Sequence, residues 1–338
     1  MAVQPDEKSL LEQAVNWINE GKKVAFATVI GTWGSSPRPV GSQLVINDQG
    51  AFVGSVSGGC IEGAVIGEAL NTISDGENRI LSFGVTNDEA WEVGLACGGD
   101  IRILVENSDN IKILRRIMDE MPFAIITNLN TKNKIYYSEN NHNSMDDLSD
   151  NLSNHLKMAF KSNIPSLIMD NEEEVFIQVY NKPLRCAIIG AVHISQALIP
   201  MAKVAGFDVL LIDPRGSFAT EERFPNVDIN DGWPDDAMLK FNADNRSAVV
   251  TLTHDPKLDD PALEVALKSK AFYIGSLGSR RTHAARIERL TDKGYSKKEL
   301  SRINAPVGLD IGAKSPSEIA VSILAEIISV KYTEPGAI

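Results

Sequence analysis

The chain has 338 residues with 43% hydrophobic and 23% charged side chains, and at about 150 residues per domain this length predicts two domains. Its 33 Lys and Arg against 45 Asp and Glu give a net charge of −12, which argues against a nucleic-acid partner because phosphate affinity comes from many Lys and Arg contacts. No apolar run approaches the ~18 residues of a membrane span, the first residues lack a signal-peptide pattern, and three cysteines are too few for a disulfide framework, so we expect a reduced, cytoplasmic protein that does not bind membranes.

The first half of the chain alternates between helical and strand-like patterns. Apolar residues at helical spacing predict a helix at residues 6–20, and Gly21 is placed to end it. The strand-like segments Gln43–Ile46 and Ala51–Val56 flank Asn47-Asp48-Gln49-Gly50, a sequence typical of a hairpin turn. The other predicted elements are a strand at Val24–Ile30, a helix opened by Cys60, strands at 79–83 and 101–105, a helix at 111–120 and a strand at 123–128.

Residues 128–163 interrupt this pattern. They are rich in Asn, Ser, Asp and Lys and have few large apolar groups outside Ile135–Tyr137, which indicates a polar hairpin or a mobile insertion. Val175–Tyr180 is strand-like again, and Asn181-Lys182-Pro183 reads as a hinge. We therefore expect an α/β domain at 1–182 and a second domain at 183–338.

The second half alternates strands and helices. Such βαβ alternation predicts a doubly wound, Rossmann-like parallel sheet. The strands are Leu184–Ile189, Asp208–Ile212, Ala248–Leu252 and Phe272–Ile274, and the helices are 193–205, 260–269 and 280–291. A last helix has a complete start signal, with Ser315 as N-cap, Pro316 at the first position and Glu318 closing a capping box.

The loop Gly190-Ala191-Val192-His193-Ile194-Ser195 stands where the dinucleotide fingerprint G-x-G-x-x-G would stand. Only the first glycine is present, and Val192 adds bulk where the backbone would approach a pyrophosphate. Asp213 follows the next strand, 23 residues after Gly190, close to the spacing of a ribose-binding acid. Two interpretations stay open: a Rossmann domain that has lost or altered its ligand, and an NAD site that includes Gly190, His193 and Asp213. His193 is otherwise a plain first-turn residue.

A second candidate for phosphate binding is Gly275-Ser276-Leu277-Gly278-Ser279-Arg280-Arg281-Thr282, which runs from a strand into a helix. Backbone N–H groups at a helix start and two arginines favour an anion there. Residues 278–302 hold eight Lys or Arg against three Asp or Glu, so this segment is basic in an acidic chain. The alternative interpretation is a solvated helix face, which we expect for the later lysines.

The three cysteines fall into two classes. Cys186 lies in an apolar strand and is expected in the core. Cys60 follows Ser57-Gly58-Gly59 at a helix start, which favours a thiolate, and Cys97 precedes Gly98-Gly99. Flanking glycines would let a bulky ligand approach either sulfur, although the spacing is a weak signal for zinc. Arg38 stands between Pro37 and Pro39, which restrict the local backbone; a surface arginine is the simpler alternative.

Several long motifs, in order, resemble the XdhC/CoxI family. The first three resemble its amino-terminal domain and the last two its carboxy-terminal Rossmann domain. They are Gly34-Ser35-Ser36-Pro37-Arg38-Pro39-Val40-Gly41, Ser57-Gly58-Gly59-Cys60-Ile61-Glu62-Gly63, Trp91-Glu92-Val93-Gly94-Leu95-Ala96-Cys97-Gly98-Gly99, Gly275 to Thr282, and Ala305-Pro306-Val307-Gly308-Leu309-Asp310-Ile311-Gly312-Ala313. The resemblance covers nearly the whole chain except 128–163.

The resemblance implies a xanthine dehydrogenase accessory protein: a cofactor-binding chaperone rather than a catalyst. Such a protein would bind molybdenum cofactor (molybdopterin), support exchange of an oxo ligand for sulfur with a cysteine desulfurase, and insert the cofactor into a xanthine dehydrogenase-type hydroxylase of purine catabolism. We expect a homodimer. The residues implied are Cys60 and Cys97 for sulfur chemistry, Cys60 also as the molybdenum contact, and Arg38, Gly58, Gly59, Gly98, Gly99, Gly190, His193, Asp213, Gly275, Gly278, Ser279, Arg280 and Arg281 for cofactor binding.

Two other functions remain in competition at this point. One is an NAD(P)-linked oxidoreductase built on the Rossmann domain, with thiol chemistry in the first domain; the incomplete glycine pattern at 190–195 argues against it. The other is a non-catalytic scaffold joining a desulfurase to a hydroxylase. The glycine-flanked Cys60 and Cys97 argue weakly against a scaffold, because a scaffold needs no accessible thiols.

Overall fold

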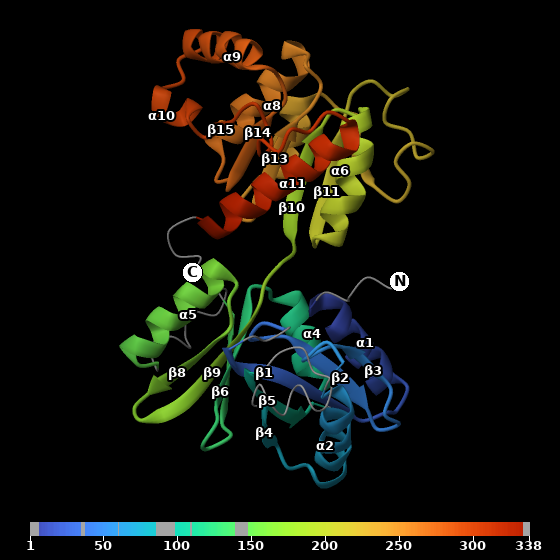
Figure 1. Cartoon of the computed structure of the whole chain (residues 1–338), viewed down its shortest axis with the longest axis vertical. Coiled ribbons are helices and arrows are strands. Elements are labelled where there is room, and N and C mark those ends of the chain that lie inside the picture. The colour runs from blue at the N-terminus through green and yellow to red at the C-terminus, as the bar shows by residue number, and fades with distance from the viewer. Residues whose placement is uncertain are drawn as a thin grey trace. The chain divides into compact units, whose positions relative to one another are not determined.

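The structure, a computed structural model, describes residues 7–34, 38–59, 61–85, 99–108, 110–138 and 148–333 (Figure 1). The chain divides into two units, Met1–Lys182 (unit 1) and Pro183–Ile338 (unit 2), and each is described by itself. No helix among the described residues is long and apolar enough to cross a membrane.

Unit 1 contains a five-stranded antiparallel sheet in the order β3-β2-β1-β5-β4. The strands are β1 (Val24–Gly34), β2 (Gln43–Asn47), β3 (Phe52–Gly54), β4 (Arg79–Val85) and β5 (Gly99–Asn107). Helix α2 (Glu62–Asp75) packs Val65, Ala69 and Ile73 on one face of this sheet. The helices α1 (Glu7–Asn19) and α4 (Ile111–Asp119) share a core with the other face, around Phe26 and Val45.

A second antiparallel sheet in unit 1 has the order β7-β6-β9-β8. Its strands are β6 (Phe123–Asn128), β7 (Lys134–Ser138), β8 (Ser166–Asp170) and β9 (Glu173–Tyr180). Helix α5 (Asp150–Ser162) packs Leu152, Leu156 and Ala159 on one face of it. The polar stretch 128–163 therefore includes a hairpin strand and an amphipathic helix, whereas its composition indicated a polar hairpin or a mobile insertion and gave no sign of the helix.

Unit 2 is a parallel six-stranded sheet in the order β12-β11-β10-β13-β14-β15, the Rossmann order. Its strands are β10 (Leu184–Ile189), β11 (Phe207–Ile212), β12 (Asp228–Asn230), β13 (Ser247–Thr251), β14 (Tyr273–Ser276) and β15 (Ile303–Asn304). The predicted α/β class with a doubly wound second half is confirmed. The short strands β12 and β15 were not predicted, because two or three residues carry no periodicity.

Helices cover both faces of the unit 2 sheet. The helices are α6 (His193–Val204), α7 (Pro234–Phe241), α8 (Pro256–Lys268), α9 (Arg280–Asp292), α10 (Lys297–Leu300) and α11 (Pro316–Thr333). α6 and α11 lie side by side over one face, and α7 and α8 pack with α9 and α10 over the other (Figure 1). The chain order reverses between β10 and β13, so the loops after β10, β11, β13 and β14 meet at the edge where such sheets bind ligands.

Candidate functional site

The first candidate site is the loop of unit 1 between β3 and α2, which is organised by Glu62. The Glu62 side chain is 7% exposed and turns back from the start of α2 toward the loop. Its Oε1 accepts hydrogen bonds from Ser55 Oγ at 2.8 Å and from the N–H groups of Val56 and Ser57 at 3.2 and 2.9 Å. Its Oε2 accepts from Ser57 Oγ and, at 2.8 Å, from the Gly59 N–H. One carboxylate thus fixes the whole segment Ser55–Gly59.

The charge on Glu62 is maintained by these donors. Burial alone would raise the pKa of this carboxyl, but the hydrogen bonds from Ser57 and Ser55 outweigh burial and lower the pKa to about 2. Ionised carboxylates accept stronger hydrogen bonds than neutral ones. The loop therefore keeps its charged anchor at every pH near neutrality.

Two glycines in this loop adopt backbone conformations that other residues avoid. Gly58 has φ 79° and Gly59 has φ 121°, and a Cβ on Gly59 would meet open space. The glycine at 59 is therefore explained by backbone conformation rather than by crowding. α2 begins at Glu62, with Ile61 as N-cap and without a side-chain cap, so the helix starts two residues after the position expected from the sequence.

The two cysteines predicted for sulfur chemistry lie close to described segments in the sequence. Cys60 directly follows the anchored loop in the sequence, but Cys60, Cys97 and Gly98 lie outside the described residues. Gly99 opens β5 and pairs with Gly34 of β1 and Val85 of β4. Arg38 lies, partly buried, in the connection from β1 to β2. Within the described ranges, no group of three or more His, Cys, Asp and Glu side chains could hold a metal ion.

The second candidate site is the carboxyl edge of the unit 2 sheet. Gly190 has φ 112°, and a Cβ there would come within 2.7 Å of the Thr253 side chain, so this turn requires glycine. Ser195, which replaces the third glycine of the fingerprint, is buried and donates its hydroxyl to the Gly190 carbonyl. His193 is exposed at the first position of α6.

The Asp213 carboxylate is already hydrogen-bonded to groups of the protein. It is fully buried, its Oδ2 accepts from the Ala191 N–H and from Arg215 Nη2 at 2.7 Å each, and its Oδ1 accepts from the N–H and Nε of Arg215 at 2.9 Å each. Burial would raise its pKa, but the bonds from Arg215 and Ala191 lower it. A ribose could reach this carboxylate only by displacing Arg215, so the spacing that suggested a ribose-binding acid is explained by a link between two loops.

The loop after β14 contains one glycine that is tightly packed and two arginines that are exposed to solvent. A Cβ on Gly275 would come within 2.6 Å of Val307 and 2.7 Å of Tyr273, so this glycine serves packing. Gly278 has φ 142°, and Ser279 caps α9 by accepting from the Thr282 N–H at 3.2 Å. Arg280 and Arg281 are exposed in the first turn of α9. Together with the exposed Ser279, these two guanidinium groups form the part of the predicted phosphate site that is most open to solvent.

Behind this loop lies a buried ion pair that the sequence analysis missed. Arg286 and Asp259 are both 2% exposed in their side chains, and Nη2 and Oδ2 are 3.9 Å apart. The same Nη2 donates to the Leu277 carbonyl at 2.9 Å, and Oδ1 of Asp259 accepts from the Thr253 hydroxyl at 2.7 Å. The pair thus joins the loop after β13 to the loop after β14. The alternative interpretation of the basic segment as a solvated helix face does not hold at Arg286, whose spacing of four from the buried Leu290 was the available signal.

Comparisons with known proteins identify the family. A family model of the XdhC Rossmann domain matches residues 186–327, and a model of the XdhC and CoxI family matches residues 17–84. The chain belongs to the XdhC and CoxI family. The first match contains all the unit 2 loops described above, and the second contains the loop anchored by Glu62.

Similar proteins have been named for molybdenum enzymes. The chain is 27% identical over 331 residues to the molybdenum cofactor insertion chaperone PaoD of Escherichia coli K12, covering 96% of this chain and 89% of that protein. It is 26% identical over 327 residues to a probable subunit of xanthine dehydrogenase from Bacillus subtilis 168, covering 93% and 95%. The fold is similar to a crystal structure described as a xanthine dehydrogenase from Bacillus halodurans, with a TM-score of 0.74, 24% identity and coverage of 97% and 98%.

Proposed function

We propose that this XdhC/CoxI family protein binds molybdenum cofactor and inserts it into a xanthine dehydrogenase-type hydroxylase. The observation that supports this most directly is the Glu62 carboxylate, which holds Ser55–Gly59 through five hydrogen bonds immediately before Cys60 in the sequence. A preformed, glycine-lined loop beside a thiol suits a bulky ligand with a soft, sulfur-bound metal. A chaperone named for molybdenum cofactor insertion is among the similar proteins.

Within this proposal the two units contribute different chemistry. In unit 1, Cys60 is the sulfur relay or molybdenum contact, and Cys97 is the second thiol. Arg38 presents a guanidinium to the cofactor, and Gly58, Gly59, Gly98 and Gly99 allow its close approach. In unit 2, the exposed guanidinium groups of Arg280 and Arg281 and the start of α9 bind the pterin phosphate. Ser279 serves that site indirectly, because its hydroxyl caps the helix.

The proposal extends to sulfuration, partners and location. A cysteine desulfurase would supply the sulfur that replaces a molybdenum oxo ligand while the cofactor is held, and a homodimer in the cytoplasm is the proposed form of the chaperone. NAD(P) binding at Gly190 and His193 is the competing function. The engagement of Asp213 by Arg215 and Ala191 weighs against that alternative, since the acid that would bind a ribose already has four donors.

The test is co-elution of cofactor and protein. The full chain is incubated with molybdenum cofactor under anaerobic, reducing conditions and passed through gel filtration, and pterin fluorescence and molybdenum content are measured in the protein peak. We expect both to co-elute with the wild type and molybdenum to be lost with Cys60→Ala. Cys186→Ala is the matched control, because Cys186 is 1% exposed and burial raises the pKa of its thiol to about 12. Absence of co-elution, or saturable binding of NADH or NADPH instead, would overturn the proposal.

A further inference from the structure

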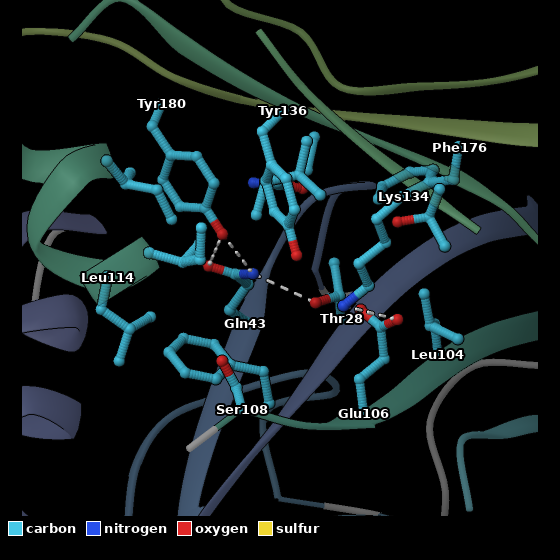
Figure 2. Close-up of a pocket in the computed structure, with 16 residues that line it drawn as sticks. Thr28, Gln43, Leu104, Glu106, Ser108, Leu114, Lys134, Tyr136, Phe176 and Tyr180 are labelled. Carbon is cyan, nitrogen blue, oxygen red and sulfur yellow. Dashed lines mark hydrogen bonds and ion pairs between the residues drawn. The ribbon is translucent and has the colours of Figure 1, made fainter. Parts of the chain in front are cut away.

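A cavity of about 50 Å³ lies in unit 1 between the two antiparallel sheets, and none of its lining residues belongs to the loop anchored by Glu62 (Figure 2). Strands β1, β2 and β5 line it from one sheet, β6, β7 and β9 line it from the other, and α4 contributes three apolar side chains. Tyr136 and Tyr180 point from the second sheet toward Gln43 and Thr28 of the first (Figure 2).

The inward positions of these strands are unusually polar. Side chains between packed sheets are normally apolar, because a polar group there loses its water. Phe176, Gln178 and Tyr180 alternate along β9 and therefore share the inward face. Nine of the sixteen lining residues carry polar side chains: Thr28, Gln43, Glu106, Ser108, Thr127, Lys134, Tyr136, Gln178 and Tyr180.

Part of this polar lining is internally satisfied and electrically neutral. Gln43 Nε2 donates to Thr28 Oγ1 and to the Tyr180 hydroxyl at 3.1 Å each. Burial raises the pKa of Tyr180, which keeps its hydroxyl protonated. Lys134 Nζ pairs with Glu106 Oε1 at 3.0 Å, so the two charged residues of the lining compensate each other. A charged ligand would meet no unpaired counter-charge there.

Gln178 is the exception in this lining. Its side chain is 4% exposed, and neither its amide nitrogen nor its amide oxygen has a hydrogen-bond partner among the described residues. Leaving both a donor and an acceptor buried and unpaired destabilises a fold, and such groups in native proteins call for an explanation. Gln178 lines a cavity, so a molecule bound there could supply the missing hydrogen-bond partners.

We propose that this cavity binds the amide edge of a small neutral molecule, a carboxamide or a lactam. Such an edge carries an N–H donor beside a C=O acceptor and so complements both ends of the Gln178 side chain. A volume of about 50 Å³ is large enough for the polar atoms of an amide edge. The remainder of the ligand would lie toward the partly exposed side chains of Ile113, Lys134 and Tyr136.

The inference is tested separately from the proposed function, because Gln178→Met alters this cavity and leaves Cys60 and the loop anchored by Glu62 unchanged. Nicotinamide tests the carboxamide, pterin tests the lactam, and nicotinate, which replaces the amide of nicotinamide by a carboxylate, is the matched control. Binding to the full chain is followed by saturation-transfer NMR titration and by the shift in Tm. We expect one of the two amides to bind saturably and nicotinate to bind at least tenfold more weakly.

The matched variant is Gln178→Met, which keeps the volume and removes the amide. Without ligand we expect it to unfold at a higher temperature than the wild type, since two unpaired polar atoms are gone, and to bind the fragment at least tenfold more weakly; Gln178→Leu serves as a second apolar replacement. Binding of nicotinamide alone assigns a carboxamide, and binding of pterin alone assigns a lactam. If neither fragment binds, or if Gln178→Met binds as the wild type does, the cavity holds only water and the inference is overturned. Co-elution of molybdenum cofactor in that case leaves the proposed function standing.

Discussion

Glu62 of unit 1 and Asp259 of unit 2 are both buried carboxylates beside candidate ligand loops, and their pKa values move in opposite directions. Around Glu62, the loop supplies N–H and O–H donors to both oxygens, and the pKa falls to about 2. Around Asp259, burial dominates and raises the pKa, although Thr253 donates to Oδ1 and Arg286 stands 3.9 Å from Oδ2. The comparison teaches that five donors converging on both oxygens offset the burial of Glu62, whereas two donated hydrogen bonds and a cation 3.9 Å away do not offset the burial of Asp259.

The largest effect is expected from removing the cation beside Asp259. Arg286→Met leaves a buried carboxylate without its counter-charge and the Leu277 carbonyl without its donor, and should lower the free energy of unfolding by about 4 kcal/mol. Urea unfolding followed by tryptophan fluorescence measures the loss. The control is Arg281→Met on the exposed side of the same helix, with an expected change below about 0.5 kcal/mol. If Arg286→Met and Arg281→Met have the same free energy of unfolding, Arg286 does not stabilise the fold through Asp259.

A smaller loss of stability is expected when Glu62 itself is removed. Glu62→Ala leaves five donors of the loop without their acceptor, and we expect the free energy of unfolding to fall by about 3 kcal/mol in the same urea assay. Glu77→Ala is the matched control, since Glu77 is largely exposed and pairs with the exposed Lys132. A loss no greater than that of Glu77→Ala would show that the loop does not depend on its anchor.

The acid response should separate the two carboxylates. The folded pKa of Glu62 lies below its unfolded value near 4.5, so its stabilisation is present above pH 5 and is lost as pH falls toward 2. Between pH 5 and pH 3 the loss amounts to about 2 kcal/mol. Glu62→Gln should remove this part of the acid dependence when urea unfolding is compared at pH 5, 4 and 3. The raised pKa of Asp259 has the opposite effect, because it makes the folded state more stable as pH falls. If Glu62→Gln loses as much free energy of unfolding between pH 5 and pH 3 as the wild type, other groups cause the acid sensitivity.

The smallest effect on folding is expected at the exposed arginines. Arg280→Ala combined with Arg281→Ala should change the free energy of unfolding by less than about 0.5 kcal/mol, because both side chains face solvent. The same variant should bind inorganic pyrophosphate about tenfold more weakly in a calorimetric titration if α9 begins a phosphate site. Lys297→Ala with Lys298→Ala, which removes two charges from α10, is the control and should leave binding nearly unchanged. Equal weakening in both would indicate a general charge effect.

Much of unit 2 was predictable because its strands are continuous apolar runs separated by turn residues. The segments Leu184–Ile189 and 193–205 were predicted almost to the residue, and a sheet buried on both faces gives that signal directly. In unit 1, the secondary structure of the stretch 128–163 was harder to predict from the sequence. Helix α5 buries three apolar residues, Leu152, Leu156 and Ala159, in a sequence that is mostly polar, so its amphipathic pattern is hard to recognise.

The groups that organise the candidate sites were harder to find from sequence. Glu62 bonds mainly to the backbone of its own loop, and those donors converge only once Gly58 and Gly59 adopt left-handed conformations. Gln178 is the one clearly polar residue among the apolar and aromatic residues of Val175–Tyr180, a pattern typical of a buried strand. A sequence shows neither which face a second sheet covers nor where a donor lacks an acceptor.

The contact between Arg286 and Asp259 also has a dynamic consequence. Since Asp259 holds Thr253 and Arg286 holds Leu277, an outward movement of either loop would pull on the other through the buried pair. The two loops should therefore open together, and their backbone amides should exchange with deuterium at similar rates. Arg286→Met would uncouple those rates, so that a ligand arriving at one loop would no longer find the other already in position.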